Sequence, residues 1–315
     1  MTEEMRCSTA VRTKHRKRWF VPLAAALIAA ATLLVLGMYD GRSAQAQSTD
    51  GGVVAAGDIA SCDSRGDERT ARLLGSIPGT VLAAGDNAYE RGSLSEFNRC
   101  YDPSWGRYKG RTKAVVGNHE YETPRASGHF DYFGRAAAGE QGKGYYSFER
   151  DEWHIVALNS ECDYVRGGCD RESPMLTWLK RDLADNPARC TLAYFHRPLF
   201  SSGQNGNDAT MRPIWNILYR AEADVVIAGH DHIYERFARQ TPSGTRTRWG
   251  IREFVVGTGG ASHGKIRNVK ANSQVRNANT YGVLKLTLRP TNYSWEFVPV
   301  AGKSFTDSGS NFCSR

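Results

Sequence analysis

The sequence predicts an α/β domain built in layers, and three observations support this fold class. Short apolar runs alternate with amphipathic segments, further strand-like runs follow near the end of the chain, and no long linker, low-complexity tract or repeat interrupts residues 51–315. Alternating strands and helices favour a sheet that is covered by helices. We therefore expect one domain over residues 47–315.

The individual elements follow from these runs. Apolar runs predict strands at 53–56, 81–84, 114–116, 145–148, 154–158, 192–195, 225–228 and 251–256. Amphipathic segments predict helices at 67–77, 174–184 and 211–222, the second with Pro174 in its first turn. The segment 281–300 predicts a hairpin that turns at residues 290–292.

Residues 1–46 are typical of an export signal. Basic residues precede the uncharged segment 20–39, and the small-x-small sequence Ala44-Gln45-Ala46 follows it. Cleavage near Ala46 is the favoured outcome, but the apolar segment is also long enough to stay as a membrane anchor. Both outcomes export the remainder, because the basic flank stays cytoplasmic. We expect a secreted or cell-envelope protein.

Cysteine usage agrees with export. Cys7 lies in the leader, and the other six of the seven cysteines are an even number, which favours up to three disulfides in an exported chain. Cys162 and Cys169 enclose a short loop and are the predicted pair. Buried free thiols are the alternative, and the absence of a C-x-x-C motif argues against a zinc site.

The charge pattern argues against several classes of partner. Half of the formal net charge of +8 lies in residues 1–46, which carry 7 Lys+Arg and 3 Asp+Glu. Residues 47–315 keep 41 − 7 = 34 basic and 33 − 3 = 30 acidic residues, a net charge of +4. The remaining +4 gives no indication of nucleic-acid binding, although it suits an anionic substrate. Membrane contact is expected only through an uncleaved anchor, and the oligomeric state is not predicted.

Potential metal ligands follow five of the predicted strands. The carboxyl ends of parallel strands converge at one edge of an α/β fold, so we expect these side chains to meet. Residues 47–315 contain seven histidines, and four of them, counting His119, follow the ends of predicted strands. This clustering favours a metal centre over isolated structural histidines. The candidate ligands at the strand ends are Asp58, Asp86, Asn118, His196, His230 and His232.

Five sequence blocks carry a family resemblance. GDIAS (57–61), GDNAY (85–89), GNHE (117–120), YFHRP (194–198) and GHDH (229–232) resemble, in order, the motifs of calcineurin-like metallophosphoesterases. Tyr89, three residues after Asp86, makes the purple acid phosphatases the most similar branch. With no extra domain expected ahead of these blocks, the chain resembles the small single-domain members. The resemblance implies a four-layer α/β/β/α sandwich of two mixed sheets. It also implies a phosphatase that hydrolyses phosphate monoesters through a hydroxide held on two metal ions.

The resemblance further implies which residues hold the ions. Asp58, Tyr89 and His232 would hold a ferric ion, with Asp86 as the bridge to a second ion that is Fe, Zn or Mn. The second ion would be completed by Asn118, His196 and His230. Carboxylate and phenolate oxygens suit a trivalent ion, whereas imidazole and amide groups suit a divalent one. The alternative for Tyr89 is simple packing after a turn.

His119 is the implied catalytic residue, because it would stabilise the phosphoryl oxygens or protonate the leaving alkoxide. Glu120 is a candidate to orient it. His129 and His154 are interpreted as structural. His263, on a glycine-rich loop, either reaches the site or lies in solvent.

The sequence departs from the family pattern in two places. Plant-type members carry a further histidine after the HxP block, and residues 201–207 contain none, so protonation of the leaving group falls to His119 or to an unidentified residue. Arg197 stands where an uncharged residue is common. It either helps to bind phosphate or is a solvated charge, and the second interpretation is slightly favoured.

Three functions are compatible with these residues. The leading hypothesis is an exported phosphatase that acts on small phosphate monoesters. A phosphodiesterase or phospholipase-like hydrolase would use the same ions, since the motifs do not include the substrate rim. A non-catalytic metal- or phosphate-binding protein would have lost a ligand or His119, and the sequence retains them all.

Overall fold

Two mixed β-sheets form the centre of the fold. The computed structural model describes residues 52–315. The strands are β1 (Gly52–Ala56), β2 (Thr80–Ala84), β3 (Thr112–Val115), β4 (Tyr146–Arg150), β5 (Trp153–Ala157), β6 (Cys190–Tyr194), β7 (Val225–Ala228), β8 (Tyr234–Phe237), β9 (Arg252–Val256), β10 (Ser273–Asn277), β11 (Gly282–Arg289), β12 (Asn292–Pro299) and β13 (Ser308–Phe312). The first sheet has the order β13-β12-β11-β1-β2-β3, and the second has the order β10-β8-β9-β7-β6-β5-β4. The central strands β1–β3 are parallel to one another, as are β5, β6, β7 and β9.

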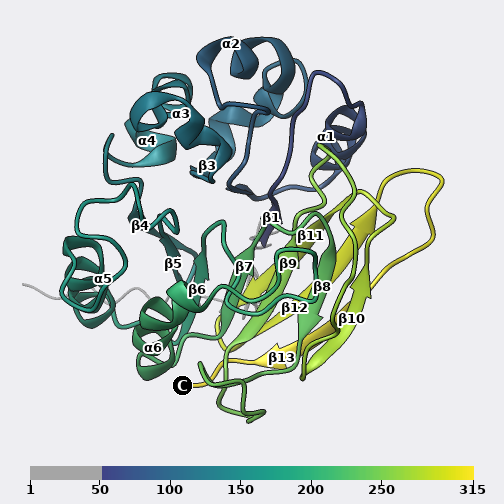
Figure 1. Ribbon diagram of the computed structural model, residues 1–315. Helices are drawn as coiled ribbons and strands as arrows, with labels where there is room; N and C mark the ends of the chain where they lie inside the picture. Colours follow the sequence, from purple (N-terminus) through teal and green to yellow (C-terminus); the bar gives the residue numbers. More distant parts are fainter. Residues whose placement is uncertain (1–51) are drawn as a thin grey trace, which may run out of the picture. The chain divides into compact units, whose positions relative to one another are not determined.

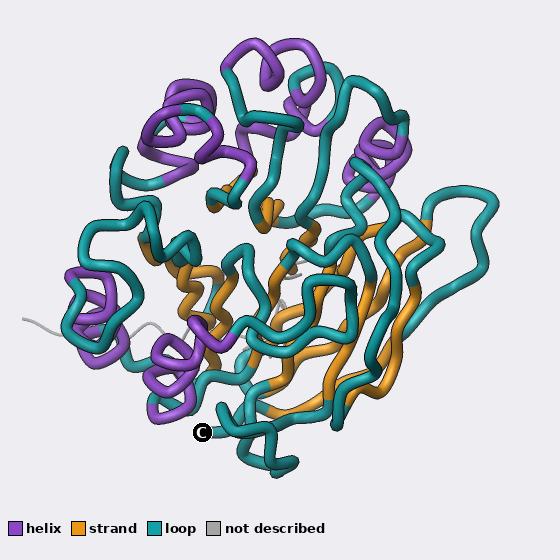
Figure 2. The backbone as a smooth tube through the Cα atoms, in the orientation of Figure 1, coloured by secondary structure: helices purple, strands orange, loops and turns teal. Residues whose placement is uncertain are grey.

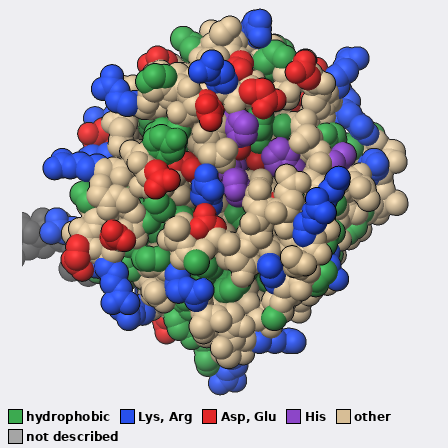
Figure 3. Space-filling model, viewed as in Figure 1, with side chains coloured by type: hydrophobic (Ala, Val, Ile, Leu, Met, Phe, Trp, Pro, Cys, Tyr) green, Lys and Arg blue, Asp and Glu red, His purple; other side chains and the backbone are tan. Residues whose placement is uncertain are grey.

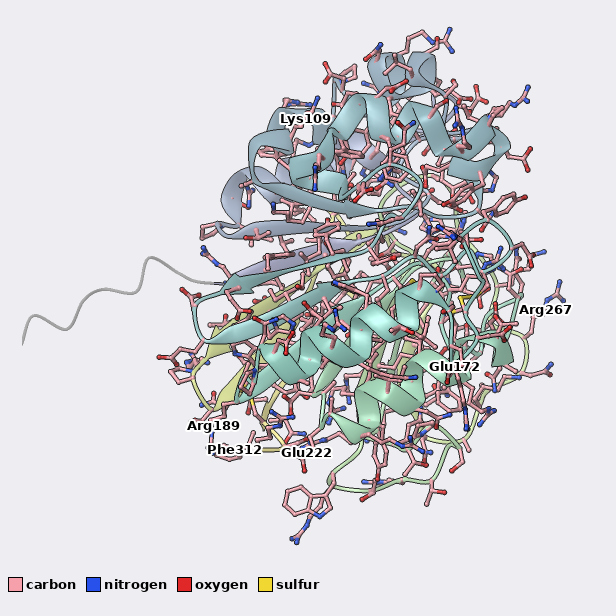
Figure 4. The ribbon with its side chains drawn as sticks, turned by 90° about the vertical axis from the view of Figure 1, so that its left-hand side faces the viewer. Lys109, Glu172, Arg189, Glu222, Arg267 and Phe312 are labelled. Carbon is pink, nitrogen blue, oxygen red and sulfur yellow. A yellow bond between two sulfur atoms is a disulfide. The ribbon has the colours of Figure 1, made fainter. Side chains whose placement is uncertain are left out.

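Helices cover the outer faces of both sheets, so the domain has four layers (Figures 1 and 4). On the side of the first sheet lie α1 (Gly66–Ser76), α2 (Leu94–Glu96), α3 (Ser127–Phe133) and α4 (Arg135–Ala138). On the second sheet lie α5 (Pro174–Asp185) and α6 (Arg212–Arg220). Figure 2 shows the strands gathered inside this shell of helices and loops. The expected α/β/β/α sandwich of two mixed sheets is confirmed.

Side chains along the strands of the second sheet point alternately to its two faces, and they contribute to two separate apolar clusters. In β6, Leu192 and Tyr194 belong to the cluster that lies between the sheets, whereas Ala193 belongs to the cluster under α5 and α6. Successive strand residues point to opposite faces, so a strand that is buried on both faces must be apolar throughout. This is why the central strands appear in the sequence as continuous apolar runs.

The helix α5 illustrates how local sequence defines an element. Ser173 caps its first turn by accepting a hydrogen bond from the Leu176 amide, and Pro174 occupies the first helical position. Leu176, Leu179 and Leu183 follow at helical spacing and are buried against the second sheet.

The predicted strands and long helices are present within a few residues of their expected bounds, and the late hairpin is β11–β12. The strands β8, β10 and β13 and the short helices α2–α4 were not predicted from the sequence. The β10 and β13 sequences, SQVRN and SGSNF, are polar because these strands form the outer edges of their sheets. An edge strand needs no continuous apolar run.

Three disulfides join all six cysteines of the described part of the chain. The predicted Cys162–Cys169 pair is confirmed, and the other two pairs are Cys62–Cys100 and Cys190–Cys313. The last pair ties the end of the chain to the start of β6 across a sequence separation of 123 residues. The alternative of buried free thiols is therefore wrong for these cysteines.

The predicted leader, cleavage site and anchor, residues 1–46, lie outside the described residues. Within residues 52–315, no helix has both the length and the apolar character that crossing a bilayer requires.

Two histidines that were interpreted as structural, His129 and His154, are buried and are not among the strand-end residues. Burial lowers the pKa of His129 to about 3, so this ring is a neutral part of the core. His154 on β5 lies between two carboxylates, with Nε2 2.8 Å from Asp182 on α5 and Nδ1 close to Glu149 on β4. Burial opposes its protonation, but the contacts with Asp182 and Glu149 outweigh burial and raise the pKa of His154.

The raised pKa of His154 makes its contribution to stability dependent on pH. A group whose pKa is higher in the folded state stabilises the fold below its unfolded pKa of about 6.5, and this stabilisation is lost as pH rises through the folded pKa. We expect His154→Gln to reduce the free energy of unfolding by about 1–3 kcal/mol near pH 5.5 and by less near pH 9. Urea unfolding at both pH values, with His263→Gln as the matched histidine control, measures the difference. An equal loss at the two pH values would contradict a charged His154.

Candidate metal centre

The seven predicted metal-ligating side chains meet at the carboxyl ends of parallel strands from both sheets. Three of these strand ends come from the first sheet and two from the second, because residues 58, 86 and 118 follow β1, β2 and β3, whereas residues 196 and 230 follow β6 and β7. The site therefore lies where the two sheets face one another rather than at the edge of one sheet. Figure 3 shows histidine side chains gathered on this face of the molecule, next to acidic and basic ones.

The first group of donor atoms surrounds the Tyr89 hydroxyl. It lies 2.9 Å from Asp58 Oδ1, 3.1 Å from Asp86 Oδ2 and 3.1 Å from His232 Nε2. His232 Nε2 is also 3.2 Å from Asp58 Oδ1. The other ring nitrogen of His232, Nδ1, is 2.6 Å from the Ser262 hydroxyl, which fixes the ring with Nε2 toward the carboxylates.

The second group surrounds His196 Nε2. This atom lies 3.1 Å from Asp86 Oδ2, 3.2 Å from Asn118 Oδ1 and 3.2 Å from His230 Nδ1. His196 Nδ1 is 3.0 Å from the Ala84 carbonyl oxygen, so this nitrogen carries the proton and donates it. When Nε2 carries no proton, as in a metal complex, its lone pair points into the site. Asp86 Oδ2 is the one atom that belongs to both groups.

The backbone at these positions is strained. Asp58, Asp86 and His230 have positive φ angles of 59°, 48° and 71°, in the left-handed region that side chains other than glycine rarely adopt. Gly117 allows a close approach there, because a Cβ on this residue would lie 2.2 Å from Asp86 Oδ1. These distortions bring side chains from separate strands to the same point.

Glu120 fixes two of the strand-end loops to each other. Its buried carboxylate accepts hydrogen bonds from the backbone amides of Asp86 (3.0 Å), Asn87 (2.8 Å) and Gly117 (2.7 Å). Burial, followed by the nearby Asp86 carboxylate, raises the pKa of Glu120 to about 7. The expectation that Glu120 orients His119 is wrong, because both of its oxygens bind backbone amides.

His119 is oriented by a different group. Its Nδ1 contacts the Glu90 carbonyl oxygen, and its ring lies 4.4 Å from the Tyr89 ring, centroid to centroid. Its Nε2 is 3.9 Å from Asp86 Oδ2, and 29% of its side chain is exposed. His119 thus lies at the solvent side of both donor groups.

The Arg197 side chain is held in place and is not a freely solvated charge, contrary to the interpretation that the sequence slightly favoured. Its Nε lies 2.9 and 3.0 Å from the two carboxylate oxygens of Glu161, which is buried. Its Nη1 lies 3.5 Å from His230 Nε2. His263, in contrast, is exposed, and its ring stacks on Tyr281 with the two centroids 3.9 Å apart.

The cluster favours bound positive charge. Burial opposes ionisation of the two carboxylates, but His232 beside Asp58 and His196 beside Asp86 hold both carboxyl pKa values below their usual range. In turn Asp86, against the effect of burial, raises the pKa of His196 to about 10. Burial and the two carboxylates raise the pKa of Tyr89 well above its ordinary value. Anionic oxygens that are held this close together suit a cation.

Sequence reasoning missed two acidic residues of the site, Glu161 and Asp208. Glu161 follows β5 in the segment Asn159-Ser160-Glu161, so the rule that polar side chains follow buried strands would have found it. Asp208 lies 3.8 Å from Arg197 Nη1, at the far end of the loop that follows β6. No local pattern marks it, because its partner is 11 residues away in the sequence and is reached only through the folded loop.

The comparisons with known proteins agree with this geometry. The calcineurin-like phosphoesterase family matches residues 53–234. The chain is 32% identical over 139 residues to purple acid phosphatase 18 and 34% identical over 155 residues to purple acid phosphatase 23, both from Arabidopsis thaliana. These matches cover 42% and 43% of this chain but 30% and 32% of the relatives, so the chain spans about a third of the length of the curated relatives it matches.

Solved structures show the same fold. The purple acid phosphatase PPD1 of yellow lupin (Lupinus luteus) has a TM-score of 0.68 at 18% identity, covering 82% of this chain and 53% of that one. GAP50 of Plasmodium, described as the anchor in the inner membrane complex, has a TM-score of 0.61 at 14% identity, covering 81% and 87%.

Glu120 supplies a test of how the strand-end loops are held. We expect Glu120→Ala to lower the free energy of unfolding by at least ~3 kcal/mol, because four buried amides, the fourth that of Ala88 at 3.4 Å, lose their acceptor. Glu120→Gln retains one acceptor oxygen and should lose less. Denaturant unfolding of the metal-free protein measures both. Glu122→Ala, an exposed acid of the same 3₁₀ turn (His119–Glu122), is the matched control. A Glu120→Ala protein as stable as this control would contradict the structural role of the carboxylate.

Proposed function

The chain belongs to the calcineurin-like phosphoesterase family, and from this premise we propose that it is an exported phosphatase with two metal ions that hydrolyses phosphate monoesters. One observation carries the proposal. Two groups of four donor atoms share Asp86 Oδ2, and neighbouring donors lie 2.9–3.2 Å apart. Atoms that bind one ion at about 2.0–2.2 Å lie about 3–3.5 Å from one another, so the donors fit two ions.

The chemistry of the donor groups supports the assignment of the ions. We propose that Asp58, Tyr89 and His232 hold a ferric ion, because carboxylate and phenolate oxygens prefer a hard trivalent cation. Asn118, His196 and His230 would hold the second ion, which is Fe, Zn or Mn, and Asp86 would bridge the two. When bound, two such ions would polarise a phosphoryl group and lower the pKa of a water molecule.

His119 is the proposed proton donor to the leaving group. Its Nδ1 faces the Glu90 carbonyl oxygen and donates to it, so Nε2 is free on the side of Asp86. A proton on Nε2 can pass to the alkoxide oxygen as its bond to phosphorus breaks. The partial exposure of His119 leaves room for an ester beside it.

Export is supported by the three disulfides, since such bonds persist in oxidising compartments outside the cytoplasm. We propose small phosphate monoesters as the substrate class because the curated relatives are named phosphatases, one of them the phosphoenolpyruvate phosphatase of Allium cepa. Phosphate diesters are the competing class, since the same ions would bind them.

Metal content and ester turnover test the proposal together. We expect the reconstituted protein to hold two metal ions per chain and to hydrolyse a chromogenic monoester faster than the matching diester. Asp86→Ala should lose both ions and at least ~100-fold in kcat/KM, because it removes the shared oxygen. Mass spectrometry of the metals and a steady-state assay give the two readouts. Faster diester turnover would overturn the substrate class, and an iron-loaded protein without a visible absorption band would overturn the Tyr89–ferric assignment.

The role of His119 is tested separately from metal binding. His119→Asn should keep both ions but lower kcat by about 10²–10⁴-fold, as expected for loss of a general acid. The loss should be smaller for an ester whose leaving group is a weak base, because that group needs no proton. His263→Asn is the matched control, since His263 stacks on Tyr281. An equal loss for all leaving groups would contradict proton donation by His119.

A further inference from the structure

We propose that Arg197 is a substrate-binding residue that holds a phosphoryl oxygen of the ester beside the metal centre, and that Glu161 and Asp208 position its guanidinium group. This inference rests on the proposed function. It adds a positively charged phosphate-binding group, the Arg197 guanidinium, to the metal centre. Such a group selects esters with two negative charges on phosphorus over esters with one.

The position of Arg197 follows from the strand that carries it. Arg197 comes directly after His196 at the carboxyl end of β6, so its side chain begins next to the metal centre. The amides of His196 and Arg197 both donate to the Ser160 hydroxyl, at 3.2 and 3.0 Å. These two bonds fasten the end of β6 to the loop after β5.

Glu161 restrains the guanidinium from one side. Only 2% of the Glu161 side chain is exposed, and its two oxygens lie 2.9 and 3.0 Å from Arg197 Nε. The Glu161 amide donates to Asn159 Oδ1 at 3.0 Å, and the Cys162–Cys169 disulfide restrains the next residue. A buried carboxylate on a cross-linked loop is a rigid support for a long side chain.

Asp208 approaches the same guanidinium from the rim. Its Oδ2 lies 3.8 Å from Arg197 Nη1, and its Oδ1 accepts a hydrogen bond from the Thr210 amide at 2.9 Å. Arg197 thus lies between acids from two loops. Both acids are separate from the metal-ligating side chains.

These contacts leave hydrogen-bond donors of Arg197 without a partner. Glu161 occupies Nε, and within residues 52–315 the Nη2 nitrogen makes no hydrogen bond, while 29% of the side chain is exposed. A guanidinium group has five donors in a planar fork, which suits a phosphate oxygen. The arrangement orients the group and leaves part of it free to bind a ligand.

The contact with His230 leaves Arg197 Nη1 available to a further acceptor. His230 Nδ1 faces His196 Nε2 at 3.2 Å and is the atom proposed to bind the second ion. A neutral imidazole that offers Nδ1 to a cation keeps its proton on Nε2, which therefore cannot accept from Arg197 Nη1, 3.5 Å away. In the metal-loaded protein Nη1 is therefore available to an oxyanion of the substrate.

The positive charge of the Arg197 guanidinium favours phosphate monoesters over diesters. A monoester dianion has one more negative charge than a diester, so a permanently charged guanidinium beside the ions attracts it more strongly. Arg197 should therefore raise the ratio of monoester to diester turnover.

Calorimetric titration of inorganic phosphate into the metal-loaded, full-length protein tests the proposal without relying on turnover. Because removal of Arg197 alone leaves the buried Glu161 charge unpaired, the main variant is the double substitution Arg197→Met/Glu161→Gln. We expect it to bind phosphate about 10- to 100-fold more weakly, with metal content unchanged. Arg197→Lys should be intermediate. Arg189→Ala, which removes an exposed positive charge just before the start of β6, should bind as the wild type does (Figure 4).

A positioning role for Glu161 has its own readout. Glu161→Gln keeps the shape of the side chain but weakens the support of the guanidinium, so phosphate affinity should fall by less than in the double variant. The monoester-to-diester ratio of kcat/KM should fall in both variants, and in neither should metal content change.

Failure of this proposal is distinguishable from failure of the proposed function. A double variant that binds phosphate as tightly as the wild type, or a wild-type protein that binds no phosphate, would overturn the role of Arg197. A wild-type protein that binds phosphate through Arg197 but hydrolyses neither ester would overturn the phosphatase assignment. The phosphate-binding role of Arg197 would still be supported.

Discussion

The Asp86 carboxylate is the group on which the rest of the site depends. Its Oδ2 lies within 3.1 Å of both the Tyr89 hydroxyl and His196 Nε2, and its Oδ1 accepts a hydrogen bond from the His119 amide at 2.9 Å. One side chain therefore connects donors from both sheets with the residue proposed as the general acid. A displacement of the β2 end would separate the two donor groups.

The fold holds this carboxylate in place at several levels. The positive φ of Asp86 turns the chain at the end of β2, and Gly117 leaves space for the carboxylate beside β3. Glu120 binds the amides on either side of this contact. Strained backbone persists only where the surroundings fix it, and here the two mixed sheets and a buried acid supply that rigidity.

The second sheet contributes the part of the site that contains Arg197. The loops that follow β5 and β6 hold Glu161 and Arg197 next to each other, and the Cys162–Cys169 disulfide follows Glu161 directly. One of the three disulfides that agree with an exported protein, Cys162–Cys169, thus also restrains the rim of the site. A cation that is fixed by a buried acid differs from a solvated charge because its orientation is set before any ligand arrives.

The sequence by itself determined the fold class, the central strands, the disulfide Cys162–Cys169 and the set of strand-end residues that the structure brings together. Each of these depends on local features: apolar runs, short spacings and polar residues directly after a strand. The edge strands β10 and β13 were missed because strands with an open edge need no apolar run. The tertiary structure alone decided that Glu120 binds backbone amides rather than His119, and that Arg197 is paired with Glu161 and Asp208. These pairings join residues from different loops, and their distances are set by how the two sheets pack, which no local pattern encodes.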